Sequence, residues 1–348
     1  KLASESGIPK DKVIKLNANE NPFGKELGLG KKLSEINIHE YPDPLQKTLR
    51  TNLASYSGRK YEEIVAGSGS DELIDLLIRI FLEKDDILID VQPTFGMYEF
   101  SAKIQGAKVC SVSRRDDFEI DLDKILNSVS NNTKMIFLAS PNNPTGNILS
   151  EPDLVKLLQS ELIVVIDETY YEFCNISFSH LINKYENLIV LRSFSKWSGL
   201  AGLRIGYAIS NPKIIEKLLL IKQPYNINTA AETVALEAIS KKDFLLEKVQ
   251  ILLEQRDRIY EFLQGKKGIK VYPSHANFLL VDFGEIDANI VFETLAKNGI
   301  FVRKFSHTMI SNALRISSGT PDQIRILLQV LDQFIKWYKK IEDYYEKC

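Results

Sequence analysis

Cysteine, histidine and long apolar runs are all scarce in this sequence of 348 residues. Its three cysteines, Cys110, Cys174 and Cys348, are odd in number and far apart. That pattern fits neither a disulfide framework nor a metal site and indicates a reducing, cytoplasmic compartment. The four histidines are equally scattered, so we expect no metal. The longest apolar runs, such as residues 162–166, fall far short of the ~20 residues that a membrane-spanning helix needs, so we expect no membrane partner.

An excess of charge of either sign is also missing. The chain has 44 lysines and arginines against 46 aspartates and glutamates, without a basic block or an acidic tail, which argues against a nucleic-acid partner. With 44% apolar and 26% charged residues, the composition is that of an ordinary globular protein. A chain of this length exceeds a usual single core and predicts two domains.

Short apolar segments alternate with helix-length segments through the first two thirds of the chain. Most of them are rich in Ile, Val and Leu without alternation, which is typical of strands covered on both faces. Between them, residues 71–84 space their apolar side chains as on one face of a helix. This alternation predicts an α/β fold with a mainly parallel seven-stranded sheet. The strand candidates begin near Ile64, Ile87, Ala107, Met135, Leu162, Leu188 and Ile205.

The pattern changes after about residue 212. A long helical stretch ends at Gly265, shorter strand candidates follow near Phe278, Ile300 and Ala313, and a final amphipathic helix begins at about Pro321. We interpret this part as a smaller α+β domain to which both termini contribute. The expected domains are therefore a large one of residues 36–239 and a small one of residues 1–35 and 240–348.

Polar residues gather at the ends of the predicted strands, where open α/β sheets place their ligands. The segment GSGSDE, residues 67–72, follows a strand and opens a helix, so its backbone N–H groups could form an anion site. A turn capped by Ser70 or Asp71 explains the same residues. The segment SPNNPTGNILS, residues 140–150, is also open to two interpretations, because Asn-Pro and Thr-Gly are turn formers.

Two further segments carry charge next to apolar strands. Asp167 ends the strand of VVIDETYYEF, where a carboxylate is costly unless a cation pairs with it, and Tyr170 follows three residues later. In LRSFSKWSGLAGLRIGY, residues 191–207, Lys196 stands among serines and glycines, and Arg204 offers a fork of donors suited to phosphate. The usual alternative for any lysine is a solvent-exposed side chain without a role in a site. The order of these groups at successive strand ends favours a common site.

The segments NNPTG, DETY and SFSKWSGLAGLRIGY, in this order and spacing, resemble the pattern of the pyridoxal-phosphate enzymes of the aspartate aminotransferase superfamily, or fold type I. The resemblance covers essentially the whole chain. It implies a large domain that binds pyridoxal 5'-phosphate (PLP), a smaller domain, and transfer of an amino group from a small-molecule donor to a 2-oxo acid.

The resemblance also implies roles for individual residues. Lys196 would carry the cofactor as a Schiff base and move the proton at the substrate carbon. Asp167 would keep the pyridine nitrogen protonated, so that the ring acts as an electron sink. Asn143 and Tyr170 would hydrogen-bond the phenolic oxygen of the ring, and Phe95 of PTFGMY would stack on the ring. The cofactor phosphate would be held by Ser70, Asp71, Ser193, Ser195 and Arg204.

Near the N-terminus, LNANENPFG (residues 16–24) and YPDP (residues 41–44) are similar to the histidinol-phosphate aminotransferase branch. In that branch the YP tyrosine reaches the cofactor phosphate of the partner subunit, so Tyr41 implies a homodimer with twofold symmetry. Arg315, with Arg303 beside it, would bind the phosphate of histidinol phosphate. In the second half of a ping-pong cycle the same site would bind a carboxylate of 2-oxoglutarate or glutamate.

Other functions remain open at this point. An aromatic or broad-specificity aminotransferase, or a threonine-phosphate decarboxylase, would use the same scaffold and anchors. A non-catalytic regulator with an aminotransferase-like fold belongs to a different class, and the full set of anchors argues against it. A Rossmann dehydrogenase is disfavoured, because GSGSDE lacks the GxGxxG pattern and Lys196 would have no role.

Overall fold

A computed structural model describes the chain from residue 7 to residue 345. Its contacts divide the chain into two compact units: unit 1, residues 1–22 and 250–348, and unit 2, residues 23–249. The sequence predicts domain boundaries after residues 35 and 239. The two units instead divide after residue 22, which is 13 residues earlier, and after residue 249, which is 10 residues later. Close contacts hold the segment after residue 22 within unit 2. A Cβ atom on Gly24 would come within 2.5 Å of the Gly199 carbonyl oxygen, and Lys241 Nζ donates to the Leu27 carbonyl at 3.1 Å.

Unit 2 contains a seven-stranded sheet with the strand order β2-β8-β7-β6-β5-β3-β4. Strands β3 to β7 pair in parallel, and β8 runs antiparallel to both of its neighbours, β2 and β7. The predicted α/β fold with a mainly parallel sheet is therefore confirmed, and every expected strand segment forms a strand. The strands are β2 (Ile64–Gly67), β3 (Ile87–Gln92), β4 (Lys108–Ser113), β5 (Thr133–Ala139), β6 (Ile163–Asp167), β7 (Leu188–Ser193) and β8 (Gly206–Ser210).

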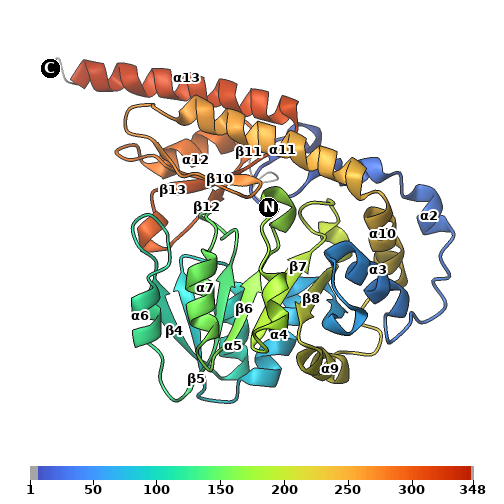
Figure 1. Ribbon diagram of the computed structural model, residues 1–348. Helices are drawn as coiled ribbons and strands as arrows, with labels where there is room; N and C mark the ends of the chain where they lie inside the picture. The colour runs from blue at the N-terminus through green and yellow to red at the C-terminus, as the bar shows by residue number, and fades with distance from the viewer. Residues whose placement is uncertain (1–6, 346–348) are drawn as a thin grey trace. The chain divides into compact units, whose positions relative to one another are not determined.

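Both faces of this sheet are buried, as the sequence pattern predicts. Consecutive residues of β6, from Val164 to Ile166, are each fully buried, although neighbours on a strand point to opposite faces. Helices α4, α5 and α9 share one apolar cluster with sheet residues such as Val165, and helices are drawn around the sheet in Figure 1. The helices of this unit are α2 (Gly30–Ser34), α3 (Lys47–Ser57), α4 (Gly69–Phe81), α5 (Met97–Gln105), α6 (Leu122–Asn127), α7 (Glu151–Leu158), α8 (Tyr171–Cys174), α9 (Pro212–Ile221) and α10 (Thr229–Ser240).

The long helical stretch that was expected up to Gly265 is two helices. Helix α10 ends at Ser240, and α11 (Lys242–Leu263) begins two residues later. Lys241 between them leaves helical geometry, with φ −105° and ψ 24°, while its N–H still bonds the Glu237 carbonyl at 3.0 Å. Helix α11 ends at Leu263, two residues before the predicted end at Gly265, whose φ of +77° glycine adopts without strain.

Unit 1 is an α+β unit to which both termini contribute, as expected. A four-stranded antiparallel sheet has the order β12-β13-β10-β9, and β1, near the N-terminus, pairs in parallel with β11. Buried side chains of α12, α13 and these strands form a second apolar core. The elements are β1 (Ile14–Lys15), β9 (Lys270–Val271), β10 (Phe278–Asp282), α12 (Ala288–Lys297), β11 (Ile300–Phe301), β12 (Arg303–Lys304), β13 (Ala313–Ser317) and α13 (Pro321–Tyr345).

The strand expected near Ile300 is divided between two sheets. Ile300 pairs with Ile14 of β1, whereas Arg303 pairs with Arg315 of β13. Val302, between the two short strands, is 4% exposed. The chain changes partner at this residue, which an apolar pattern alone cannot indicate.

Candidate active site

The polar segments singled out above meet at one edge of the unit 2 sheet. Parallel strands place their carboxyl ends at the same edge, and β8 begins there because it runs the opposite way. Asp167, the last residue of β6, pairs with Ala139 of β5 and Leu191 of β7. On the other side, Ser193 of β7 pairs with Gly206, which in turn pairs with Gly67 of β2. The register therefore brings the segments after β5, β6, β7 and β2 side by side.

Asp167 is a buried carboxyl group held by neutral donors. Its Oδ2 atom accepts a hydrogen bond from the Tyr98 hydroxyl at 2.8 Å, and Oδ1 accepts one from the Thr169 backbone N–H at 3.0 Å. Burial raises the pKa of Asp167, against the lowering effect of hydrogen bonds from Thr169 and Tyr98, and the nearby charge of Asp71 also raises it. A cationic ligand group at this position would stabilise the ionised carboxylate.

Backbone N–H groups and a guanidinium meet at the N-terminus of α4. The Arg204 guanidinium lies over Gly69, where a Cβ atom would come within 2.6 Å of Nη2. Arg204 Nη2 also pairs with Asp71 Oδ2 at 2.6 Å. On the sheet side, a Cβ atom on Gly206 would meet the Ser70 backbone nitrogen at 2.6 Å, so only glycine allows this close approach. A helix N-terminus beside a guanidinium is suited to a phosphate.

The alternative that this turn is capped by Ser70 or Asp71 is wrong. The helix begins at Gly69, its N-cap is Ser68, and no side chain caps it. The Ser68 N–H instead donates to the Glu72 carboxylate one turn later. The side chains of Ser70 and Asp71 are therefore not used as caps.

Two serine hydroxyls and Lys196 follow β7. Ser193 Oγ donates to Ser195 Oγ at 2.9 Å and accepts from the Ser195 N–H at 3.1 Å, which fixes the turn that ends the strand. Lys196 is half-buried, and its neighbours Ser195 and Trp197 are buried. The turn thus carries a half-buried amine eight residues before Arg204.

Asn143, Tyr170 and Phe95 lie at the ends of the other strands. Asn143 is half-buried in the turn after β5, and Tyr170 is 5% exposed just before α8. Phe95, after β3, is half-buried and meets the Tyr98 ring edge-on, with centroids 5.6 Å apart. Asn142 holds two of these turns together, since its Oδ1 accepts from Thr94 Oγ1 at 2.8 Å.

Tyr41 lies outside this group, in an exposed part of unit 2. Its side chain is 80% exposed and stacks on the ring of Tyr225, with centroids 4.4 Å apart. Ile38 and Leu45 nearby in the sequence, together with Leu220, are also exposed by 50% or more.

The predicted substrate arginines lie in unit 1. Arg303 and Arg315 are directly opposite on β12 and β13, so their side chains project to the same face of the sheet. Arg303 is exposed, whereas Arg315 is 7% exposed and donates to the Asn17 carbonyl at 2.6 Å. Like charges directly opposite in a sheet are destabilising.

The described part of the chain, residues 7–345, contains no group of three or more His, Cys, Asp or Glu side chains able to hold a metal ion. Nor does it contain a helix long and apolar enough to cross a membrane. Cys110 and Cys174 are free thiols, and Cys348 lies outside the described residues.

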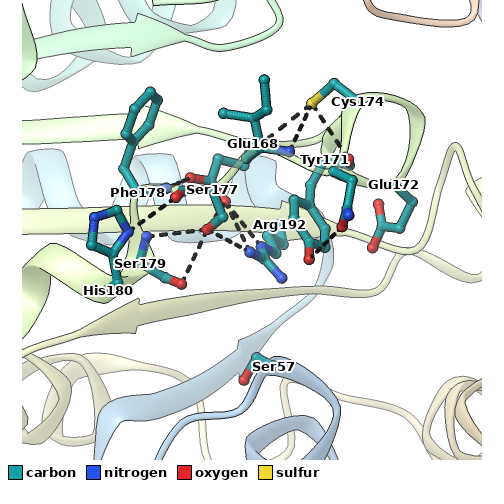
Figure 2. A network of polar contacts seen from close by, with 12 residues as sticks. Ser57, Glu168, Tyr171, Glu172, Cys174, Ser177, Phe178, Ser179, His180 and Arg192 are labelled. Carbon is teal, nitrogen blue, oxygen red and sulfur yellow. Dashed lines mark hydrogen bonds and ion pairs between the residues drawn. The ribbon is translucent and has the colours of Figure 1, made fainter. Parts of the chain in front are cut away.

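Sequence reasoning missed a buried ionic cluster around Arg192 of β7 (Figure 2). Arg192 Nε donates to Glu168 Oε2 at 3.1 Å, and its Nη2 donates to Ser177 Oγ at 2.6 Å. The guanidinium also lies 3.6 Å from the centre of the Tyr171 ring. Glu172 is buried close by, and burial raises the pKa of its carboxyl to about 7. The sequence does contain one sign of this cluster, which is an arginine within the mostly apolar strand β7.

Replacing Arg192 with methionine is expected to lower the free energy of unfolding by about 3–5 kcal/mol, because Glu168 keeps a buried charge without its cation. Both side chains of this pair are at most 3% exposed. Urea denaturation of the cofactor-free protein measures the change. Lys213→Met is the control, since its partner Glu186 and Lys213 itself are both more than 60% exposed and the expected change is below about 1 kcal/mol. Equal losses in the two variants would contradict the structural role of Arg192.

The chain is similar to known aminotransferases in sequence and in fold. The family model of class I and II aminotransferases matches residues 11–331. A histidinol-phosphate aminotransferase of Roseiflexus castenholzii is 42% identical over 95% of this chain and 92% of that protein. The chloroplastic histidinol-phosphate aminotransferase 1 of Arabidopsis thaliana is 42% identical over 96% and 81%. The crystal structure of histidinol-phosphate aminotransferase from Sinorhizobium meliloti with pyridoxal-5'-phosphate has a TM-score of 0.88 at 25% identity, covering 97% of this chain and 94% of that chain.

Proposed function

The chain belongs to the class I and II aminotransferases, in the histidinol-phosphate aminotransferase family, and we propose its reaction from that premise. It transfers the amino group of L-histidinol phosphate to 2-oxoglutarate, giving imidazole-acetol phosphate and L-glutamate, a step of histidine biosynthesis. The observation that carries this substrate assignment is 42% identity to a protein of that name along 92% of its length.

The residues of the sheet edge fit PLP as the cofactor. Arg204 and the N-terminus of α4 offer donors for the phosphate, next to the Ser193 and Ser195 hydroxyls. Asp167 offers a buried carboxylate that a protonated ring nitrogen would stabilise. When bound, PLP supplies an electron sink for the electron pair left on the substrate carbon. We assign unit 2 to the cofactor and unit 1 to the small domain.

Lys196 then has two tasks in the proposed reaction. Its Nζ atom would hold the cofactor covalently, and it would also move the proton at the substrate carbon. Both tasks need an amine that can lose its proton. Asn143 and Tyr170 would hydrogen-bond the phenolic oxygen of the ring, and Phe95 would stack on the ring.

Arg315 and Arg303 bind the substrate anion in this proposal. A guanidinium donates two parallel hydrogen bonds to phosphate or carboxylate alike. One site can therefore accept the phosphate of histidinol phosphate and then a carboxylate of 2-oxoglutarate. The pairing of the two arginines on one face of β12 and β13 supports this role.

We also propose that the enzyme is a homodimer in the cytoplasm. The 80% exposure of Tyr41, its stacking on Tyr225 and the exposed Ile38 support a subunit interface at this surface. Tyr41 then serves the cofactor phosphate of the partner subunit. The cytoplasmic location rests on the three widely separated cysteines of the sequence.

Mixing two inactive variants tests the shared site. Tyr41→Ala and Lys196→Ala homodimers each lack one component at both sites, whereas a mixed dimer has one site with both Lys196 and the partner's Tyr41. Refolding an equal mixture is expected to restore about a quarter of wild-type turnover, because half of the dimers are mixed and each has one complete site. Activity of the mixture equal to the mean of the separate variants would contradict a shared site.

Side-by-side turnover tests the substrate. The kcat/KM for transamination of L-histidinol phosphate is expected to exceed that of L-phenylalanine, because only the former places a phosphate on Arg315. L-Threonine phosphate is expected to release no carbon dioxide. A preference for phenylalanine would indicate an aromatic aminotransferase, and release of carbon dioxide a decarboxylase. Absence of any turnover with bound PLP would favour a non-catalytic protein.

A further inference from the structure

Tyr98 is a fully buried residue that contacts Asp167, the carboxyl group assigned to the cofactor ring in the proposed function. It lies in the first turn of α5, is 0% exposed, and its hydroxyl donates to Asp167 Oδ2 at 2.8 Å. Tyr98 belongs to the same PTFGMY segment as Phe95, and the sequence pattern indicates no role for it.

The Tyr98 ring is held from two sides, so its hydroxyl has a fixed direction. It stacks on Phe137 of β5, with centroids 4.7 Å apart and planes 11° apart, and it meets Phe95 edge-on at 5.6 Å. Burial, followed by the charge of Asp167, raises the pKa of the Tyr98 hydroxyl well above its usual value. Tyr98 therefore keeps its proton and acts as a donor to Asp167.

We propose that Tyr98 is a positioning residue that selects the ionised form of Asp167 and thereby gives this protein its preference for a cofactor with a basic ring nitrogen. The inference rests on the proposed function, since it assigns Asp167 to that nitrogen. A hydrogen bond to a carboxylate is roughly twice as strong as one to a neutral carboxyl group. The Tyr98 hydroxyl thus contributes most when Asp167 is charged, which is when a protonated ring nitrogen faces it.

The test compares two cofactors that differ at one ring atom. One is PLP, and the other is its 1-deaza analogue, in which CH replaces the ring nitrogen. Both can bond to Lys196 and occupy the phosphate site. Only PLP has a ring nitrogen that, when protonated, stabilises the ionised form of Asp167. The measured quantity is the ratio of the dissociation constants of the analogue and of PLP, obtained by titrating the cofactor-free protein.

Tyr98→Phe is expected to lower this ratio about tenfold, because PLP binds more weakly while the dissociation constant of the analogue is unchanged. The variant loses one charge-assisted hydrogen bond and keeps both ring contacts. Tyr207→Phe is the matched control, because Tyr207 is an equally buried tyrosine, on β8 of the unit 2 sheet. The ratio of dissociation constants for this variant is expected to stay at the wild-type value. In the Asp167→Asn background, Tyr98→Phe is expected to have no further effect on the ratio.

Tyr98→Leu is a second variant that loses both the hydroxyl and the stacking ring. It is expected to lower the ratio by the same factor while binding both cofactors more weakly, and it keeps the question answerable if Tyr98→Phe does not fold. An unchanged ratio in the Tyr98 variants, or an equal loss in Tyr207→Phe, would overturn the inference. If the wild-type protein binds neither cofactor, the proposed function itself fails, which is a separate result.

Discussion

Replacing Lys196 with alanine is expected to lower turnover of L-histidinol phosphate by at least about 10⁴-fold. The substitution removes both the covalent anchor and the group that moves the proton at the substrate carbon, and proton transfer alone contributes about 10²–10⁴. The loss is measured as kcat with saturating PLP, so that weaker cofactor binding does not contribute. No structural cost is expected, because Lys196 is only half-buried.

The variant Lys196→Arg tests whether the positive charge of Lys196 alone is sufficient for activity. Arginine keeps the positive charge but cannot lose it at neutral pH, so this variant is expected to be as inactive as Lys196→Ala. Borohydride reduction followed by mass spectrometry of the wild-type protein is expected to find the cofactor on the peptide that contains Lys196. Labelling of another lysine, or near-wild-type kcat in either variant, would show that Lys196 is not the anchor.

Replacing Asp167 with asparagine is expected to lower kcat by about 10²–10³, the usual loss when one preorganised electrostatic contact to a reacting group is removed from a buried site. Asparagine has nearly the same shape and can still accept from the Tyr98 hydroxyl, which in the wild type lies 2.8 Å from Asp167 Oδ2. It cannot become an anion, so the ring nitrogen loses the charge that keeps it protonated. The rates are measured by single-turnover kinetics with bound PLP.

Asp90→Asn is the matched control for Asp167→Asn. Asp90 of β3 is also buried in the unit 2 sheet, and burial raises the pKa of its carboxyl to about 6. It has no assigned contact with the cofactor, so its replacement is expected to change kcat by less than threefold or so. If both variants lose activity equally, the effect of Asp167 is a general consequence of losing a buried carboxyl group in this sheet.

The strands and the polar residues at their ends could be predicted from the sequence because each has a local signature. Runs such as residues 162–166 are apolar without alternation, and in a parallel sheet their ends must fall at one edge. That is why Asp167, Ser193 and the segment before α4 could be placed near one another without a structure. The register adds what the pattern could not supply, namely that Gly206 lies between the last two.

Other features depend on contacts between residues far apart in the sequence, which no local pattern indicates. Tyr98 and Asp167 are 69 residues apart, and the buried pair of Arg192 and Glu168 joins β7 to the residue that follows β6. The division of the segment after Ile300 between two sheets has the same cause, since it depends on β1 at the other end of the chain. Buried polar groups of this kind become visible only when their hydrogen-bond partners are known.

The most direct test of the account is an absorbance titration of the purified protein. PLP is expected to give the visible band of the cofactor bound to Lys196, L-histidinol phosphate is expected to remove that band, and 2-oxoglutarate is expected to restore it. These two changes are the two halves of the proposed ping-pong reaction. A band that forms but does not respond to L-histidinol phosphate would contradict the proposed substrate, and failure to form any band would contradict the cofactor site itself.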